Sequence, residues 1–358
     1  MPEQRPSYSA AELRTFTERL FRHWNVPSPH AAIVADTLLS ANLRGVDTHG
    51  VARIPGYIDR FRHKLVEPVP RISVETRLPF AAAIDGGNGM GPVVAQAAMD
   101  EVLKRADSLG VGIATARRSN HFGAAAYYAL QAARKDCVGL CLSPASKSLA
   151  PFGSREPLFG TNPVAAAVPA GRHAPWVMDM ATSVAARGHI RLAARHGESI
   201  PEGWALDAEG RPTTNAEHAL AGVMLPFSGV KGSAIAMLVD ILGGVLSGSG
   251  FGGTIRDMTR DFTAPQDVGH FFLAFRVEAL MPLAEFNARM EEEIARLKAL
   301  KPAAGFSEVL YPGEPEARKE QERSRSGIPL SAQVVAALRK EAEEAGLAFP
   351  DPVLAPAD

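Results

Sequence analysis

The segment FAAAIDGGNGMGPVVAQAAMDEVLKRADSLGVGIATARRS (80–119) decides the fold class. Its first residues predict a strand that runs into a turn, and residues 92–110 predict a helix that ends at Gly110. Residues 111–119 predict a second strand, and the alternation of helix and strand continues over 124–144. Strands that alternate with helices in this way are typical of an α/β core.

Helical segments are expected on both sides of this core. Residues 8–60 are largely helical in pattern, and Ser9 followed by Glu12 forms a capping box at their start. Two amphipathic patterns with charged faces, 282–300 and 331–347, predict helices near the other end of the chain. The alternating strands are therefore expected to lie between two helical ends.

The segment 231–248 has the strongest pattern of a buried helix. Over 232–250 the chain carries Asp240 and several glycines and serines, and no aromatic or basic residue anchors the stretch in an interface. We therefore expect a helix inside the protein and no membrane span.

Composition excludes several classes of protein. The chain has 358 residues, of which 46% are hydrophobic and 22% charged, and its formal net charge is −1. This length exceeds the roughly 100–200 residues of a typical domain and indicates two domains or one large one. Without a basic excess, the chain has no overall attraction to nucleic acid or to an anionic membrane. We expect neither as a partner.

The two cysteines, Cys137 and Cys141, lie on one face of a predicted strand. Four residues apart on a strand, they are too far from each other for an easy disulfide, and small buried side chains explain them better. So few cysteines in a long chain indicate a reducing compartment. The first residues also lack the apolar stretch of a signal peptide, so we expect a cytoplasmic protein.

The glycine-rich turn after the first strand departs from the pattern of a dinucleotide-binding loop. A Rossmann phosphate loop needs Gly-x-Gly-x-x-Gly, and here Pro92 stands where the third glycine belongs. The following strand ends in Arg117 and Arg118 and offers no acid for a ribose. We therefore expect no Rossmann site. We also expect no metal, because no cluster of histidine, cysteine and acidic residues has zinc-like spacing.

The segment RGVDTHGVARIPGY (44–57) concentrates the residue types that bind and protonate a small acid. A guanidinium, from Arg44 or Arg53, binds a carboxylate through two parallel hydrogen bonds. An imidazole, here that of His49, ordinarily titrates near neutral pH and passes protons. This combination suits a small hydroxy or keto acid. The alternative, a surface loop with ordinary salt bridges, stays open from the spacing alone.

The segment RSNHFG (118–123) follows a predicted strand and precedes a predicted helix. Residues at the carboxyl ends of strands in α/β proteins face ligand crevices. His121 is therefore placed to donate or accept a proton, and Asn120 to hold its ring. The alternative is an asparagine that caps the helix beside a histidine without a catalytic role.

Three further loop elements, GTNP (160–163), DMATS (179–183) and GVKG (229–232), are rich in backbone donors and small polar side chains. A turn or a capping residue explains each of them separately. Together they form a candidate phosphate-binding set. Its members include Thr161, Asn162, Lys231 and Gly232.

Short segments in order along nearly the whole chain resemble the malate/L-lactate dehydrogenase family, which lacks a Rossmann fold. The family includes L-sulfolactate, ureidoglycolate and 2,3-diketogulonate oxidoreductases and Δ1-piperideine-2-carboxylate reductases. The matching segments are RGVDTHGVARIPGY (44–57), SNHFGAAAYY (119–128), PLFGTNPVA (157–165), MDMATS (178–183), IPEGWALDAEGRPTT (200–214), LPFSGVKGSAIAMLVDILGGVLSG (225–248), VGHFFLAF (268–275) and VLYPGEPEARKE (309–320).

The resemblance implies NAD or NADP bound on a fold of the family's own, an α/β fold with a large mixed sheet flanked by helices. It also implies a helical domain built from both termini, and a homodimer whose active site lies between domains. On this chain, residues 1–75 would begin the helical domain and residues 76–280 would form the nucleotide-binding sheet domain. Residues 281–358 would supply helices that return to the helical domain.

The resemblance also assigns roles to residues. His49 and His121 are the expected catalytic histidines, and Arg53 is the expected carboxylate-binding arginine. Arg44, Tyr57 and Asn120 are expected to contact the substrate. The implied cofactor contacts fall on Asp179, Met180, Ala181, Lys231, Gly313 and Glu314.

Two features of the cofactor site are left open. Ala145 stands where relatives often have a polar residue, and Ser143, Ser146 or Lys147 is expected to take over that contact; we assign it to Ser146. The contact that separates NAD from NADP falls on Arg187 or Arg191, which are equally well explained as solvated helix charges.

The implied reaction is reversible hydride transfer between the nicotinamide and C2 of a small 2-hydroxy or 2-keto carboxylic acid. His121 is the preferred acid–base because it follows a strand near the cofactor segments, and His49 then orients the substrate, although the two roles are exchangeable. One alternative is NADPH-dependent reduction of a cyclic imino acid such as Δ1-piperideine-2-carboxylate. Another is a dinucleotide-binding protein without catalytic activity.

Overall fold

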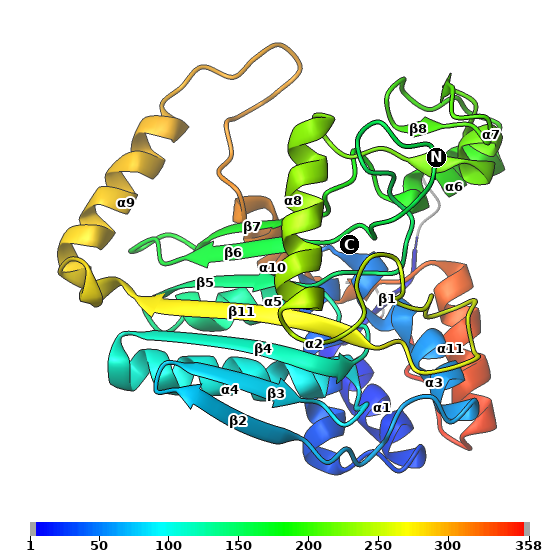
Figure 1. Cartoon of the computed structure of the whole chain (residues 1–358), viewed down its shortest axis with the longest axis horizontal. Coiled ribbons are helices and arrows are strands. Elements are labelled where there is room, and N and C mark those ends of the chain that lie inside the picture. Colours follow the sequence, from blue (N-terminus) through cyan, green and yellow to red (C-terminus); the bar gives the residue numbers. More distant parts are fainter. Residues whose placement is uncertain (1–4, 354–358) are drawn as a thin grey trace.

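A mixed sheet of seven strands forms the centre of the computed structural model, which describes residues 5–353 (Figure 1). The order across the sheet is β2 (Ser73–Leu78), β3 (Ala81–Asp85), β4 (Val111–Ser119), β11 (Val268–Arg276), β5 (Cys137–Leu142), β6 (Val164–Val168) and β7 (Trp176–Met180). β3 and β4 run parallel, and the other neighbouring pairs are antiparallel. The α/β core with a mixed sheet is therefore as predicted.

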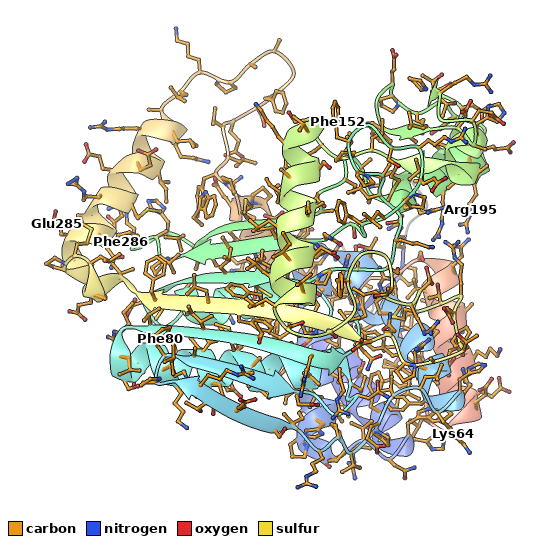
Figure 2. The ribbon with its side chains drawn as sticks, viewed as in Figure 1. Lys64, Phe80, Phe152, Arg195, Glu285 and Phe286 are labelled. Carbon is orange, nitrogen blue, oxygen red and sulfur yellow. The ribbon has the colours of Figure 1, made fainter. Side chains whose placement is uncertain are left out.

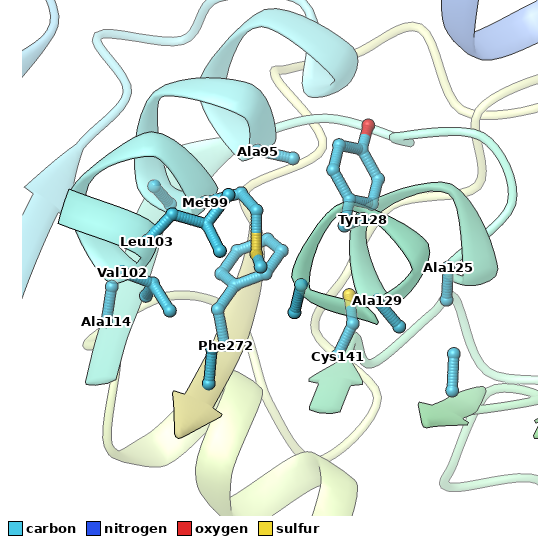
Figure 3. Packing of buried hydrophobic residues seen from close by; sticks show 14 of the residues in the cluster. Ala95, Met99, Val102, Leu103, Ala114, Ala125, Tyr128, Ala129, Cys141 and Phe272 are labelled. Atoms are coloured by element: carbon cyan, nitrogen blue, oxygen red, sulfur yellow. The ribbon is translucent and has the colours of Figure 1, made fainter. Parts of the chain in front are cut away.

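Helices cover both faces of this sheet. α4 (Gly91–Leu109) and α5 (Ala126–Ala133) pack on one face, and α8 (Val230–Asp240) lies across the other (Figure 1). Small residues, mostly alanine, line the layer under α4 and α5, so these helices approach the strands closely. Larger side chains, among them Tyr128 and Phe272, fill the remaining space (Figure 3).

Both ends of the chain contribute to one helical body with a shared hydrophobic core. Its elements are β1 (Ser7–Tyr8), α1 (Ala10–His23), α2 (Ser28–Leu43), α3 (Ile54–Arg62), β12 (Ile328–Pro329) and α11 (Ala332–Glu344). The two short strands pair with each other and tie the ends of the chain together. At the start of α1, the Ser9 side chain accepts a hydrogen bond from the N–H of Glu12, so the predicted cap is present.

The C-terminal helices divide between the two parts of the molecule. α10 (Glu314–Ser326) joins the helical body, where Glu320 pairs with Arg44 of the α2 end. α9 (Leu283–Lys298) instead follows the central strand β11 and extends beyond that end of the sheet (Figure 1), and its buried Ile294 packs beside the start of β7. Of the segment expected to return to the helical body, α10 and α11 therefore do so and α9 does not. The domain boundaries themselves stay predictions.

A small unit beside the sheet was not foreseen from the sequence. It consists of α6 (Arg187–His196), α7 (Ala216–Ala221) and a sheet of three very short strands, β8 (Ala205–Leu206), β9 (Pro212–Thr213) and β10 (Val223–Met224). Strands of two residues are too short to show any periodicity. The edge strand β2 was also missed, because all its side chains are exposed and no apolar alternation marks it.

The segment 231–248 differs from the predicted buried helix. α8 ends at Asp240 and continues as a π-helical turn over Ile241–Val245. The sheet covers it from one side only, so Met237 and Leu238 on the other side are 54% and 50% exposed. No helix in residues 5–353 is both long and apolar enough to cross a membrane.

Candidate active site

His121 follows β4 and is held by Tyr57 of α3. The Tyr57 hydroxyl lies 2.8 Å from Nδ1 of His121, and the backbone N–H of Gly123 donates to the same nitrogen at 3.4 Å. A backbone N–H only donates, so Nδ1 is an acceptor and the Tyr57 hydroxyl donates to it as well. The proton of the neutral ring is therefore on Nε2.

His49 lies against His121, so the structure brings together two clusters that are far apart in the sequence. It belongs to a short 3-10 turn, Asp47–His49, and a second such turn, Val51–Arg53, leads into α3. The two imidazole rings stack with centroids 5.7 Å apart and an angle of 24° between their planes. Both rings are only partly buried, so a ligand has access to them.

Arg53 presents a free guanidinium edge at this place. Its Nε donates to the carbonyl of Thr48 at 2.6 Å, and within residues 5–353 the side chain forms no ion pair. Arg44, in contrast, is buried and pairs with Glu320 at 3.0 Å. Of the two arginines expected to bind a carboxylate, Arg53 alone therefore has its terminal nitrogens available beside the histidines.

Burial and charge keep both histidines neutral. Burial, followed by the charge of Arg53, lowers the pKa of His49 to about 4. The same causes, with His49 and His270 adding to them, lower the pKa of His121 well below its usual range. Burial raises the pKa of Tyr57, so its hydroxyl keeps its proton. Both imidazole rings are therefore neutral in the protein without substrate.

Asn120 does not hold the His121 ring, as its neighbouring position had suggested. Its amide donates to the carbonyl of Gly89 at 2.8 Å and to Oδ1 of Asn88 at 3.2 Å. It thus ties the end of β4 to the turn before α4, and Tyr57 takes the role that sequence proximity had assigned to Asn120. The neighbour in sequence was the wrong partner, because side chains at consecutive positions after a strand point in different directions.

His270 is a residue of this region that the sequence analysis missed. It lies on the central strand β11, with Nε2 at 2.8 Å from the hydroxyl of Ser119 and Nδ1 at 2.9 Å from that of Ser143. Its ring stacks on Phe122 at 4.5 Å with an angle of 6° between planes. Burial lowers its pKa to about 3. A histidine inside the apolar run HFFLAF was the available signal.

Hydrogen bonds connect several of the expected cofactor residues. Oδ1 of Asn162 accepts from the N–H of Ala145 at 3.0 Å, and its amide donates to the carbonyl of Ala236 in α8 at 2.8 Å. The carbonyl of Thr161 accepts from both the N–H and the hydroxyl of Thr182. The loops after β5, β7 and before β6 are thereby fixed to each other and to α8.

The remaining cofactor residues lie around this frame. Asp179 on β7 accepts a hydrogen bond from the N–H of Ala126 at 2.9 Å, and burial raises its pKa to about 6. The turn at Gly313 packs on the backbone of β7, and Glu314 is engaged by Lys298 at 2.9 Å. Met180 and Ala181 continue β7, Lys231 and Gly232 begin α8, and Ser146 lies in the loop after β5.

Metal ligands are missing from the part of the chain that the structure describes. No group of three or more histidine, cysteine, aspartate or glutamate side chains there is placed to hold a metal ion. The arrangement of two neutral histidines, one tyrosine and one unpaired arginine instead suits proton transfer to a small anion.

A family model described as malate/L-lactate dehydrogenase matches residues 8–339. The chain belongs to this family. The family resemblance seen in the sequence is therefore confirmed. Among curated relatives, the L-sulfolactate dehydrogenase of Methanothermobacter thermautotrophicus is 38% identical over 87% of this chain and 89% of its own length. The malate dehydrogenase of Pyrococcus horikoshii is 36% identical over 94% of each chain.

Solved structures in the family have the same fold. The sulfolactate dehydrogenase from Methanocaldococcus jannaschii superposes with a TM-score of 0.90 and 34% identity, over 95% of this chain and 98% of that one. A Δ1-piperideine-2-carboxylate reductase from Pseudomonas syringae has a TM-score of 0.84 and 29% identity, over 94% and 99%. Relatives also include dehydrogenases named for NAD(+) and for NADP(+). The non-Rossmann α/β fold predicted from the sequence is thus confirmed.

Proposed function

We propose that the protein is an NAD(P)-dependent dehydrogenase that interconverts a small 2-hydroxy acid and its 2-keto acid. One observation carries this proposal: the Nε2–H of His121, fixed by Tyr57 on the other side of the ring, lies in a site with an unpaired guanidinium, that of Arg53. The guanidinium suits the carboxylate, and the imidazole suits the oxygen on the neighbouring carbon.

The residues proposed for the cofactor fit a dinucleotide. Lys231 is exposed at the first turn of α8 and forms no ion pair within residues 5–353, so it is free for a phosphate at the helix N-terminus. The other proposed contacts are Ser146, Thr161, Asn162, Asp179, Met180, Ala181, Gly232, Gly313 and Glu314. The nicotinamide supplies or accepts the hydride when bound.

The residues of this chain then bind, orient and protonate the substrate. Arg53 binds the carboxylate and fixes the face of the substrate. During reduction, negative charge grows on the carbonyl oxygen, and the Nε2–H of His121 donates to it. During oxidation the ring starts with its proton on Nδ1, so that Nε2 is free to accept the hydroxyl proton. His49, which belongs to the segment 44–57 and stacks on His121, also contacts the substrate.

The second candidate function is reduction of a cyclic imino acid. The structural similarity to the Δ1-piperideine-2-carboxylate reductase, a TM-score of 0.84, favours it. An imine is readily protonated in water, so a protein acid is needed less. Replacement of His121 would then reduce turnover only slightly.

We further propose that the protein works as a homodimer. The outer face of α8 and its π-helical turn carries a row of exposed apolar side chains: Val230, Met237, Leu238, Ile241 and Val245. Phe152, 65% exposed, packs beside the first residues of the same helix (Figure 2). A continuous apolar face of this kind is typical of a protein interface, and a second copy is the occupant that the family resemblance implies.

The proposed compartment is the cytoplasm. Cys137 and Cys141 are both free and buried, and burial raises the pKa of each thiol. Two reduced and unreactive thiols in a chain of 358 residues fit a reducing compartment.

A substrate screen tests the proposed function. Purified protein is mixed with NADH or NADPH and with pyruvate, oxaloacetate, sulfopyruvate or Δ1-piperideine-2-carboxylate, and the loss of absorbance of the reduced cofactor is followed. Turnover of a keto acid that collapses in His121→Ala supports the dehydrogenase. Turnover of the imine alone, retained in His121→Ala, supports the second candidate. Cofactor binding without turnover of any of them contradicts both.

A further inference from the structure

A small cavity lies beside His121 and is also lined by Tyr57. Its volume is about 10 Å³, and its lining includes Tyr57, Arg60, Asn120 and His121. A space of this size is about what one water molecule needs, provided that two or more polar groups face it. The cavity lies at the junction of α3 with the end of β4, where the helical body meets the sheet.

Two polar atoms of the lining residues are buried without a partner. Nε of Arg60 and Oδ1 of Asn120 have no hydrogen-bond partner among residues 5–353, although Arg60 is 1% exposed and Asn120 4%. Every other polar group of these side chains is engaged: Arg60 donates to the carbonyls of Asp261 and Ala264, and the Asn120 amide donates to Gly89. Both residues line the cavity, and a water molecule there would satisfy a lone donor and a lone acceptor together.

We propose that this cavity is a water site that serves the acid–base histidine. The water accepts from Nε–H of Arg60, donates one hydrogen to Oδ1 of Asn120 and its other hydrogen to the oxygen of Tyr57. Tyr57 in turn donates to Nδ1 of His121, at the distance of 2.8 Å already described. A chain of hydrogen bonds thus runs from a buried arginine to Nδ1 of His121, the ring nitrogen opposite the one that protonates the substrate.

The chemical reason for the chain is the neutrality of the histidine. A neutral imidazole that only gives up its Nε2 proton becomes an imidazolate, which is a poor outcome near neutral pH. If Nδ1 gains a proton from Tyr57 while Nε2 loses one, the ring stays neutral throughout. Tyr57 then takes a proton from the water, which leaves a hydroxide in place of the imidazolate. A hydroxide is the stronger base in bulk water, so the relay depends on the hydrogen bond that the positively charged guanidinium of Arg60 donates to it.

The protons balance over one turnover. The hydride comes from the reduced nicotinamide, and the substrate oxygen takes the Nε2 proton. After the product leaves, solvent returns a proton to Nε2 through the accessible side of the ring, and the shifts at Nδ1, Tyr57 and the water reverse. One solvent proton is consumed, and every group returns to its starting state. The role of the water in this proton relay rests on the proposed dehydrogenase function, whereas the presence of the water does not.

A crystal structure of the unmodified full chain at about 1.5 Å or better tests the site directly. The expected result is a water molecule within hydrogen-bond distance of Nε of Arg60 and Oδ1 of Asn120, with or without cofactor. A well-ordered cavity without a water overturns the proposal. This outcome does not depend on turnover, so it is separable from failure of the proposed function.

Kinetics in mixtures of H2O and D2O test the role. If several protons move in the rate-limiting step, the rate of keto-acid reduction by the wild type falls along a curved line as the deuterium fraction rises. A straight line would mean that only one proton moves, which contradicts the relay. Val66 also lines the cavity and offers a matched pair of variants. Val66→Ile fills the space and should lower kcat at least about tenfold while leaving KM, cofactor affinity and Tm near their wild-type values.

The companion variant Val66→Ala widens the cavity, keeps the water and should retain kcat within about twofold. A Val66→Ile protein whose crystal structure shows the cavity filled, yet whose kcat and solvent isotope effect are unchanged, overturns the relay. If Val66→Ile does not fold, the wild-type crystal structure and the wild-type isotope curve still decide the matter.

Discussion

The hydroxyl of Tyr57 lies 2.8 Å from Nδ1 of His121, although 64 residues separate them in the chain. Tyr57 belongs to the helical body and His121 to the end of a sheet strand, so this hydrogen bond joins the two parts of the molecule at the candidate active site. It also fixes which ring nitrogen carries the proton. The position of the proton-donating nitrogen of His121 therefore depends on how the helical body packs against the sheet.

Tyr57→Phe is expected to lower kcat for keto-acid reduction by roughly tenfold, the equivalent of about one hydrogen bond. Without the hydroxyl, Nδ1 loses its principal partner and the ring is free to place its proton on the wrong nitrogen. Tyr311→Phe is the control, because that hydroxyl donates to Ala174 at the far end of β7. The measurement is the steady-state kcat of both variants. An equal loss of kcat in Tyr57→Phe and Tyr311→Phe would mean that the loss comes from reduced stability and not from the contact with His121.

Arg53→Lys is expected to raise KM for the acid and to lower kcat/KM by roughly 10- to 100-fold, as the loss of a charge-assisted fork predicts. A lysine keeps the charge but not the two parallel donors. Arg117→Lys serves as the control, since Arg117 is 51% exposed and pairs with Asp85 on the edge side of the sheet. Unchanged kcat/KM in Arg53→Lys would remove Arg53 from the substrate site.

His270→Phe is expected to flatten the dependence of stability on acid pH. The folded protein holds this histidine at a pKa of about 3, below its unfolded value, so between pH 6 and pH 4 the unfolded chain binds one more proton there. The free energy of unfolding of the wild type should therefore fall by about 1.4 kcal/mol per pH unit more than that of the variant as pH decreases.

Urea unfolding of both proteins at pH 7, 6 and 5 measures this difference. Asp179, with a pKa raised to about 6, contributes a slope of the opposite sign, because its stabilising neutral form is lost as pH rises from 4 to 6. That contribution is common to both proteins and cancels in the comparison. Parallel curves for wild type and His270→Phe would show that His270 titrates normally in the folded state.

The double substitution Met237→Asp and Ile241→Asp is expected to convert the proposed dimer into a monomer. Two carboxylates on the apolar face would have to lose their water in the interface, which is far costlier than exposing them on a monomer. Leu109→Asp, at a residue equally exposed on the opposite face of the sheet, should leave the mass unchanged. Light scattering after size-exclusion chromatography reads out both; a wild-type monomer would contradict the dimer.

Gly313→Ala is expected to weaken NADH binding. Gly313 has a φ of +92°, and a Cβ there would lie 2.9 Å from the backbone nitrogen of Val177 on β7. The turn would have to move away from the strand that carries Asp179. Gly305 has nearly the same φ, +89°, but open space around it, so Gly305→Ala isolates the effect of backbone strain. Fluorescence titration with NADH compares them; equal affinities would place the Gly313 turn outside the cofactor site.

The sequence predicted the features that depend on local pattern. The alternation over 80–144 gave the order of β3, α4, β4, α5 and β5, and Ser9 with Glu12 gave the cap of α1. The residue types at His49, Arg53 and His121 pointed to proton transfer on a small acid. The sequence did not reveal the edge strand β2 or the short strands near α6 and α7, because exposed or very short strands show no alternation of apolar and polar residues.

What the sequence determined, then, is the family, the fold class and the chemical character of the site, since periodicity, caps and residue types act within a few positions of one another. The tertiary structure decided which side chains of the site form hydrogen bonds and ion pairs with each other. It placed Tyr57 on His121, paired Arg44 with Glu320 and left Arg53 free, and set His270 between Ser119 and Ser143. These contacts arise where the helical body meets the sheet or where β11 enters between β4 and β5, and no local pattern encodes that packing.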